Sequence, residues 1–215
     1  TGVQTCALPI SLMKTDTSIL YNQTVDSNSH LELAEQYVAE TMALFASPTW
    51  RNKLQKRGVH LSDGDFYFSR RSDQGKLRAQ QVPTIKTSIQ INGPRDIVFP
   101  MLSQPERAAE WEPTETGYKW INRFDDQHGV YSAINKFPLL GERYSLLFGV
   151  TRARLDSETS LHTIRAVQFA GQQPVTAQKQ LYQQIFAWLV EDLPAGGDRK
   201  STRLNSSHDQ ISYAV

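Results

Sequence analysis

Residues 129–149 read GVYSAINKFPLLGERYSLLFG, and this stretch indicates most directly how the chain folds. Two runs of strand-forming residues flank the segment PLLGE at 138–142, whose proline and glycine are typical of a turn. Strands joined by so short a connection pair antiparallel, because a parallel crossover needs a dozen or more residues. The stretch therefore predicts a β-hairpin.

Similar extended segments continue on both sides of this hairpin. Upstream, TIKTSIQIN at 84–92 alternates in a way that predicts a strand with one buried face, and Asp63-Gly64 predicts a hairpin turn between two short strands. Downstream, the apolar run IFAWLV at 185–190 predicts a last strand. The remaining strands are predicted at 118–124, 129–137, 144–155 and 160–169.

Two helical segments interrupt the strands. Apolar residues recur at three- and four-residue steps from Leu31 to Phe45, which predicts an amphipathic helix that ends at Ser47-Pro48. PRDIVFPMLSQPERAAEW at 94–111 predicts a short helix bent at Pro100, followed by another short turn. Helices set apart from a run of antiparallel strands predict an α+β domain.

Composition limits the classes of function. The 215 residues suffice for one domain, and 39% hydrophobic with 21% charged residues is ordinary for a soluble globular protein. The net charge of +1 provides no field to attract nucleic acid, so we expect no nucleic-acid partner. Cys6 is the only cysteine, which excludes an internal disulfide. With neither a long apolar run nor a signal-peptide pattern, the sequence predicts a cytoplasmic protein.

The two ends differ from the rest. Residues 1–10, TGVQTCALPI, and 199–215, RKSTRLNSSHDQISYAV, lack helical or strand periodicity, and the second is polar enough to predict disorder. Both strings resemble translated sequencing-adapter sequence, so we expect them to be artefacts. The expected organisation is a non-domain segment at 1–28, one domain at 29–198 and an artefactual disordered tail at 199–215.

Several fragments, in this order, resemble the START (StAR-related lipid-transfer) family of the helix-grip superfamily. After the opening strands with Trp50 and Gly58, the segment at 91–113 is similar to one in which a short helix precedes a Trp-Asp pair, here Trp111-Glu112. The hairpin at 129–149 resembles the family's strand, apolar loop and Arg-Asp sequence. The resemblance implies a helix-grip fold, in which a curved antiparallel sheet surrounds helices and an internal apolar cavity.

Two departures from the family pattern are visible. Arg143 is followed by Tyr144 in place of the family's acidic residue, so any salt bridge there is lost or made elsewhere. The family's long C-terminal helix is expected just past Gly197, where the sequence enters the adapter-like string. We therefore expect this chain to lack that helix and to leave the sheet face open.

The implied cavity predicts a set of ligand-contacting side chains. Each aromatic residue of the set is equally consistent with a place in the hydrophobic core, because only every second residue of a strand faces the cavity. Arg143 would orient a polar headgroup or form a structural ion pair, and Leu139 and Leu140 of the PLLG loop would contact a membrane. The candidate ligand-binding residues are Trp120, Phe124, Tyr131, Arg143, Phe148 and Trp188.

The function these features predict is non-catalytic binding or transfer of a lipid or sterol-like molecule. The four histidines of the expected domain have no Glu or Cys at a metal-ligand interval, so we expect surface histidines, no metal and no cofactor. One alternative is a helix-grip enzyme of the cyclase or hydrolase type using Tyr131, Arg143 and Tyr144. Another is a regulatory interaction domain. The four histidines are His30, His60, His128 and His162.

Overall fold

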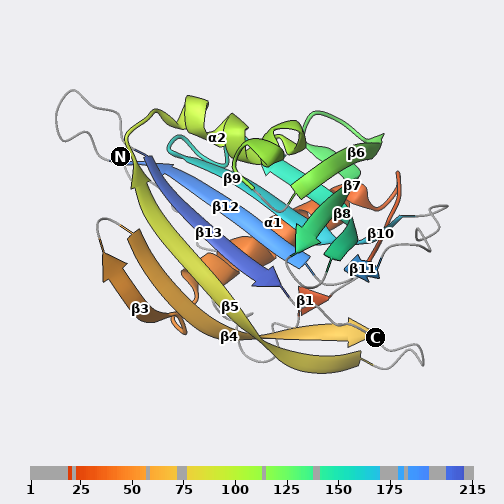
Figure 1. Ribbon diagram of the computed structural model, residues 1–215, viewed down its shortest axis with the longest axis horizontal. Coiled ribbons are helices and arrows are strands. Elements are labelled where there is room, and N and C mark those ends of the chain that lie inside the picture. Colours follow the sequence, from red (N-terminus) through yellow and green to blue (C-terminus); the bar gives the residue numbers. More distant parts are fainter. Residues whose placement is uncertain are drawn as a thin grey trace, which may run out of the picture.

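The structure is a computed structural model in which one large curved sheet is packed against two α-helices (Figure 1). The structure describes residues 19–20, 23–56, 59–71, 77–112, 115–137, 141–169, 179–181, 184–193 and 202–210.

Helices occupy two places in the chain. Helix α1 spans His30–Ala46, as the apolar periodicity predicts, and Asp26 holds its start by accepting the backbone N–H groups of Asn28 and Ser29 at 2.8 Å each. Helix α2 spans Arg95–Ser103 with Pro94 as its N-cap residue and Pro100 inside it. The 3₁₀ helix η2, Pro105–Glu110, follows directly.

The described strands include those predicted at 84–92, 118–124, 129–137, 144–155, 160–169 and 185–190. They are β1 (Ile19–Leu20), β2 (Thr24–Val25), β3 (Arg51–Lys56), β4 (Val59–Arg71), β5 (Leu77–Ile91), β6 (Glu115–Arg123), β7 (His128–Phe137), β8 (Gly141–Arg152), β9 (Thr159–Ala166), β10 (Gln168–Phe169), β11 (Lys179–Leu181), β12 (Gln184–Asp192) and β13 (Thr202–Gln210).

The main sheet is mostly antiparallel. Its order is β1-β4-β5-β13-β12-β9-β8-β7-β6, with β3 beside β4 and β11 beside β8, while β2 and β10 pair separately. The hairpin read first in the sequence is β7 and β8, with Tyr131 opposite Leu147 and Phe137 opposite Gly141. The antiparallel α+β prediction is confirmed.

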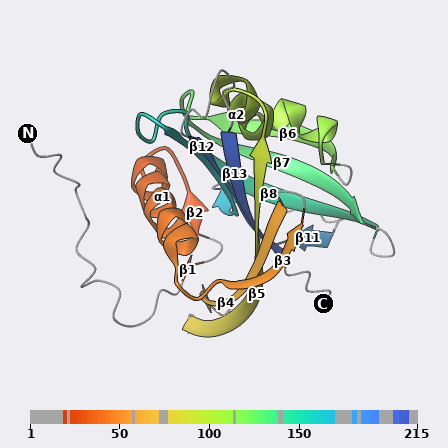
Figure 2. The same cartoon turned by 90° about the vertical axis from the view of Figure 1, so that its left-hand side faces the viewer.

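The sheet has two faces with different coverings, as the views in Figures 1 and 2 show. On β8, Tyr144, Leu146, Phe148 and Val150 belong to one apolar cluster with residues of α1. Leu147, on the alternate side of the strand, belongs to a second cluster that includes Leu102 of α2. Side chains alternate across a strand, so α1 covers one face and α2 covers the other. We call these the α1 face and the α2 face.

The structure differs from the sequence-based expectation at Asp63-Gly64. These residues lie within β4 and pair with Ile85 and Thr84 of β5, so no turn forms there. Asp63 is fixed instead by ion pairs with Arg51 at 3.0 Å and Lys53 at 3.1 Å, across from β3. A long ladder with cross-strand charges thus overrides a local turn signal.

Two segments that lie outside the predicted domain at 29–198 take part in the fold. Val25 of β2, within 1–28, is fully buried in the cluster of the α1 face. Thr202–Gln210, within the tail expected to be disordered, forms β13 between β12 and β5. A strand is held by backbone hydrogen bonds, which composition does not report, so polarity alone misjudged this segment.

Candidate functional site

The α2 face carries an aromatic cluster. Trp188 of β12 packs edge-on against Trp111 at a centroid distance of 5.5 Å, and Trp120 of β6 packs edge-on against Tyr131 of β7 at 5.4 Å. Apolar residues of α2, Val98 and Phe99, close this layer against Val190 of β12. Such edge-to-face ring pairs leave a rigid apolar surface under the α2 segment.

A pocket of about 250 Å³ opens where this cluster meets the turn between β6 and β7. One wall comes from α2 and η2, the floor from the strands, and the rim from the turn. The lining includes Phe99, Pro100, Gln104, Glu106, Trp120, Asp125, Gln127, His128, Tyr131, Gly149, Thr151 and His162. The wall at Phe99, Pro100, Trp120 and Tyr131 is apolar or aromatic, while polar and charged side chains form much of the rest of the lining, so the pocket offers both kinds of contact to a small molecule.

Two glycines make room for the aromatic floor. A Cβ atom at Gly129 would lie 2.5 Å from Cζ3 of Trp120, closer than carbon atoms approach, so a side chain there would displace the indole ring. A Cβ atom at Gly149 would lie 3.3 Å from Cε1 of Tyr131 and 3.5 Å from Cε1 of His162. Glycine at both positions therefore keeps the pocket open.

His162 of β9 is the buried titratable group of the pocket. Its ring stacks on Trp188 at 5.6 Å, and its Nδ1 lies 2.9 Å from Oγ1 of Thr151. Burial lowers the pKa of His162 to about 4, since the charged imidazolium cannot be solvated there. At neutral pH the pocket floor thus presents an uncharged imidazole.

Arg143 is a buried cation on the same face. It is 7% exposed and lies on the alternate side of β8 from Tyr144, in line with Leu147 and Gly149. Within the described residues its one polar contact is donation from Nη1 to the carbonyl of Glu142 at 2.8 Å, and no described carboxylate pairs with it. Because a buried charge is costly unless it is paired, an anionic or polar ligand group would be a favourable partner for this guanidinium.

The predicted ligand residues divide between the two faces. Trp120, Tyr131 and Trp188 gather on the α2 face, and Arg143 lies on it. Phe124 and Phe148 instead pack together on the α1 face, with ring centroids 6.1 Å apart. Their assignment to the same site is corrected, because strand alternation turns them away from the pocket. Leu139 and Leu140 lie outside the described residues.

The proposed catalytic set does not assemble. Tyr144 lies in the cluster of the α1 face, whereas Tyr131 and Arg143 lie on the α2 face. The expectation of surface histidines is wrong for His128 and His162, which are 6% and 2% exposed. Single histidines give no periodic signal, so burial of these two could be found only from the pairing of β7, β8 and β9.

Comparisons with known proteins agree with this fold. Human StAR-related lipid transfer protein 5 superposes with a TM-score of 0.66 at 13% identity, covering 88% of this chain and 86% of that one. The human StarD13 lipid transfer and protein localization domain gives 0.56 at 14% identity, covering 84% and 81%. A STAR-related lipid transfer protein from Xanthomonas axonopodis gives 0.55 at 11% identity, covering 76% and 85%.

The chain therefore has the helix-grip fold of these StAR-related structures, as its sequence fragments predict. No family model matches the chain, and a search of the curated proteins gave no match either. Neither described helix is long and apolar enough to cross a membrane. No helix follows β12 in the part of the chain that the structure describes.

Proposed function

We propose that this protein binds a lipid or sterol-like molecule on the α2 face of its sheet and transfers it without chemical conversion. The observation that carries the proposal is the pocket walled by Phe99, Trp120 and Tyr131. Trp120 and Tyr131 also pack in the apolar cluster that contains Trp188. The START-like fold of the lipid transfer proteins named above supports it.

The driving force is removal of apolar surface from water. Each 100 Å² of ligand and wall that leaves water is worth about 2.5 kcal/mol. The pocket of about 250 Å³ is smaller than the roughly 300–1,000 Å³ usual for whole ligands, so it would take one end of the molecule. The rest would extend along β7 and β8 over Ala133 and Leu147.

Arg143 would orient the ligand. Along β8, six residues separate Gly149 at the pocket from Arg143, about 20 Å at the usual strand rise. That spacing matches an elongated amphipathic molecule with its apolar end in the pocket and its polar end at the guanidinium. The Tyr144 ring cannot share this role because it faces α1.

The loop at 138–140 is our candidate for transient membrane contact. Its sequence, PLL, joins the strands β7 and β8 that carry Tyr131 and Arg143. A loop with two leucines would enter the headgroup region and release ligand between membrane and pocket.

Vesicle-to-vesicle transfer of a fluorescent phospholipid tests the proposal. The chain should accelerate transfer, and the double variant Leu139→Ser/Leu140→Ser should slow it at least tenfold while ligand affinity in solution is retained. Leu31→Ser/Leu54→Ser is the matched control, because those two leucines are exposed and lie on α1 and β3. Unchanged transfer in the loop variant would remove the loop's role, and absence of any lipid uptake would refute the function.

A further inference from the structure

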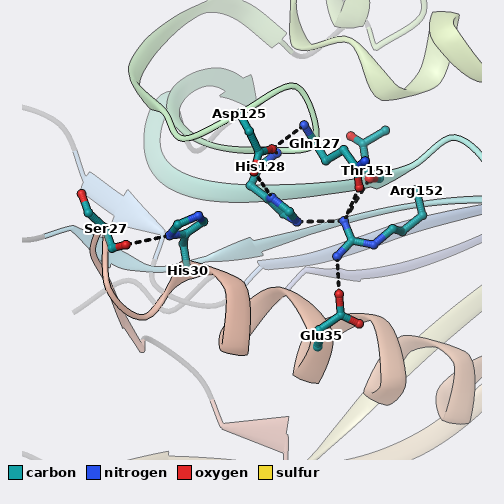
Figure 3. A network of polar contacts seen from close by, with 8 residues as sticks. All are labelled: Ser27, His30, Glu35, Asp125, Gln127, His128, Thr151 and Arg152. Carbon is teal, nitrogen blue, oxygen red and sulfur yellow. Dashed lines mark hydrogen bonds and ion pairs between the residues drawn. The ribbon is translucent and has the colours of Figure 1, made fainter.

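Three side chains with metal-ligand chemistry meet beside the pocket, on the side nearest α1. His30 begins α1, Asp125 lies in the turn between β6 and β7, and His128 is the first residue of β7 (Figure 3). Each offers one ligand atom, and these atoms all lie within 4.8 Å of one another. About 1 Å of side-chain movement would bring them to the spacing of a tetrahedral site with bonds near 2.1 Å.

His30 is already oriented for such a role. Its Nδ1 lies 3.1 Å from the carbonyl oxygen of Ser27, which can only accept, so Nδ1 carries the proton and Nε2 keeps a free lone pair. The Phe124 ring stacks on the imidazole at 4.2 Å and 9°, fixing its plane. A carbonyl that accepts from the distal nitrogen is the usual outer support of a metal-ligating histidine.

Asp125 supplies the anionic ligand. Oδ1 accepts the N–H of Gln127 at 2.7 Å and that of His128 at 2.8 Å, which fixes the carboxylate. Oδ2 lies 2.7 Å from Nδ1 of His128.

His128 needs one rearrangement. Its Nε2 lies 2.8 Å from Nη1 of Arg152, which only donates, so in this arrangement the His128 proton is on Nδ1. Coordination at Nδ1 would move the proton to Nε2, with no net change in the number of protons on the ring. Arg152 must then turn away from Nε2.

Arg152 can release His128 without losing its partners. Its Nη1 has two N–H groups but three acceptors, since Gln127 Oε1 lies at 2.9 Å and the Thr151 carbonyl at 3.2 Å in addition to His128. Its Nη2 donates to Oε1 of Glu35 at 2.6 Å. Two acceptors for the two N–H groups of Nη1 remain after release, so the exchange leaves Nη1 fully hydrogen-bonded.

We propose that His30, Asp125 and His128 form a binding site for a borderline divalent transition-metal ion of the Zn²⁺ type. Two imidazole nitrogens and one carboxylate suit such ions, whereas Ca²⁺ and Mg²⁺ prefer oxygen ligands throughout. One coordination position remains for water. The bound ion would tie the start of α1 to the turn whose Asp125 and His128 form the rim of the pocket.

The site has a distinctive dependence on Arg152. A guanidinium next to a dication repels it, and it also competes for His128. Removing a ligand should weaken the site, while removing this cation should strengthen it. An adventitious surface histidine would show neither effect.

Zn²⁺ titration of the full chain against a chromophoric chelator tests the proposal. Cys6→Ser serves as the background, so that the thiol does not bind the ion. We expect one Zn²⁺ per chain, at least tenfold weaker binding in His30→Gln, and binding about threefold to tenfold tighter in Arg152→Gln. His60→Gln, an exposed histidine on β4, is the matched control and should change nothing.

The Co²⁺ absorption spectrum gives a second readout that does not depend on stability. The chain should show ligand-field bands of a tetrahedral nitrogen and oxygen site, and His30→Gln should abolish them while its circular dichroism stays native. The proposal is overturned if Zn²⁺ does not saturate at one per chain, if His60→Gln weakens binding as much as His30→Gln, or if Arg152→Gln weakens it.

Discussion

The two faces of the sheet differ in how they accommodate a buried cation. On the α1 face, side chains of α1 and the strands interlock, and the buried cation Arg165 pairs with Glu40 and stacks over Tyr37 at 4.1 Å. On the α2 face, the buried cation Arg143 has no described carboxylate partner, and a pocket lies nearby. Residues at the centre of both faces are buried, and the α2 face differs in carrying a pocket at the edge of its cluster and a buried cation without a described carboxylate partner.

The paired cation of the α1 face should give the largest effect on stability. Arg165 is 3% and Glu40 21% exposed at the side chain, so Glu40→Ala leaves a buried guanidinium without its counter-charge. We expect a loss of about 3–5 kcal/mol in the free energy of unfolding, measured by urea denaturation. Glu32→Ala, an exposed position on the same helix, should cost well under 1 kcal/mol. Equal losses in the two variants would show that the α1 face is not built around this pair.

Acid should destabilise the protein through His162 on the α2 face. Folding lowers the pKa of His162 from 6.5 to about 4. Between these two pH values the His162 side chain is protonated in the unfolded chain and neutral in the folded chain. The contribution of neutral His162 to the free energy of unfolding is therefore complete above pH 6.5. It is lost as the pH falls toward 4, by on the order of 3 kcal/mol. Urea denaturation across this range should show the slope, and His162→Gln should remove it. A slope that persists in His162→Gln would place the responsible group elsewhere.

Filling the pocket should separate binding from folding. Gly149→Leu places a side chain between Tyr131 and His162, so lipid affinity should fall at least tenfold, about 1.4 kcal/mol. Gly117→Leu is the matched control on β6, where a Cβ atom would meet nothing within 4 Å. Fluorescent-lipid binding provides the measurement, with melting curves as a check on folding. Undiminished affinity in Gly149→Leu would mean that the ligand does not enter this pocket.

The smallest effect on the free energy of unfolding is expected at the second ion pair between α1 and the sheet. Glu35 pairs with Arg152, but the Glu35 side chain is 73% exposed, so solvent screens the pair. Glu35→Gln should cost at most about 1 kcal/mol of unfolding free energy, and the difference should shrink further in 0.5 M salt. A cost comparable to that of Glu40→Ala would mean that exposure does not separate the two links.

The sequence predicts the fold more completely than it predicts the residues of the candidate site. The alternation around Ile85 and the periodicity of α1 report burial directly, and the ordered START-like fragments gave the topology. Face assignment was harder, because Phe124 and Phe148 are as aromatic as Trp120 and Tyr131. Only the register of β7 against β8 decides which ring points toward α2.

The sequence pattern does not predict the histidine cluster or the environment of Arg143, for another reason. His30 and His128 come together because α1 packs across the turn between β6 and β7, a contact between distant segments. Arg143 could be named from its place in the hairpin, but its burial without a carboxylate is a property of the assembled sheet. Thr202–Gln210 pairs with β12 through its backbone, and the pattern of its side chains does not predict this pairing.

Photo-crosslinking with a diazirine-labelled fatty acid or phospholipid tests the division between the two faces most directly. After irradiation of the full chain, mass spectrometry should place the adducts on residues of the α2 face, such as Tyr131, Leu147 and Trp188. Adducts on Phe124, Phe148 or Tyr37 of the α1 face, or no saturable labelling at all, would contradict the account.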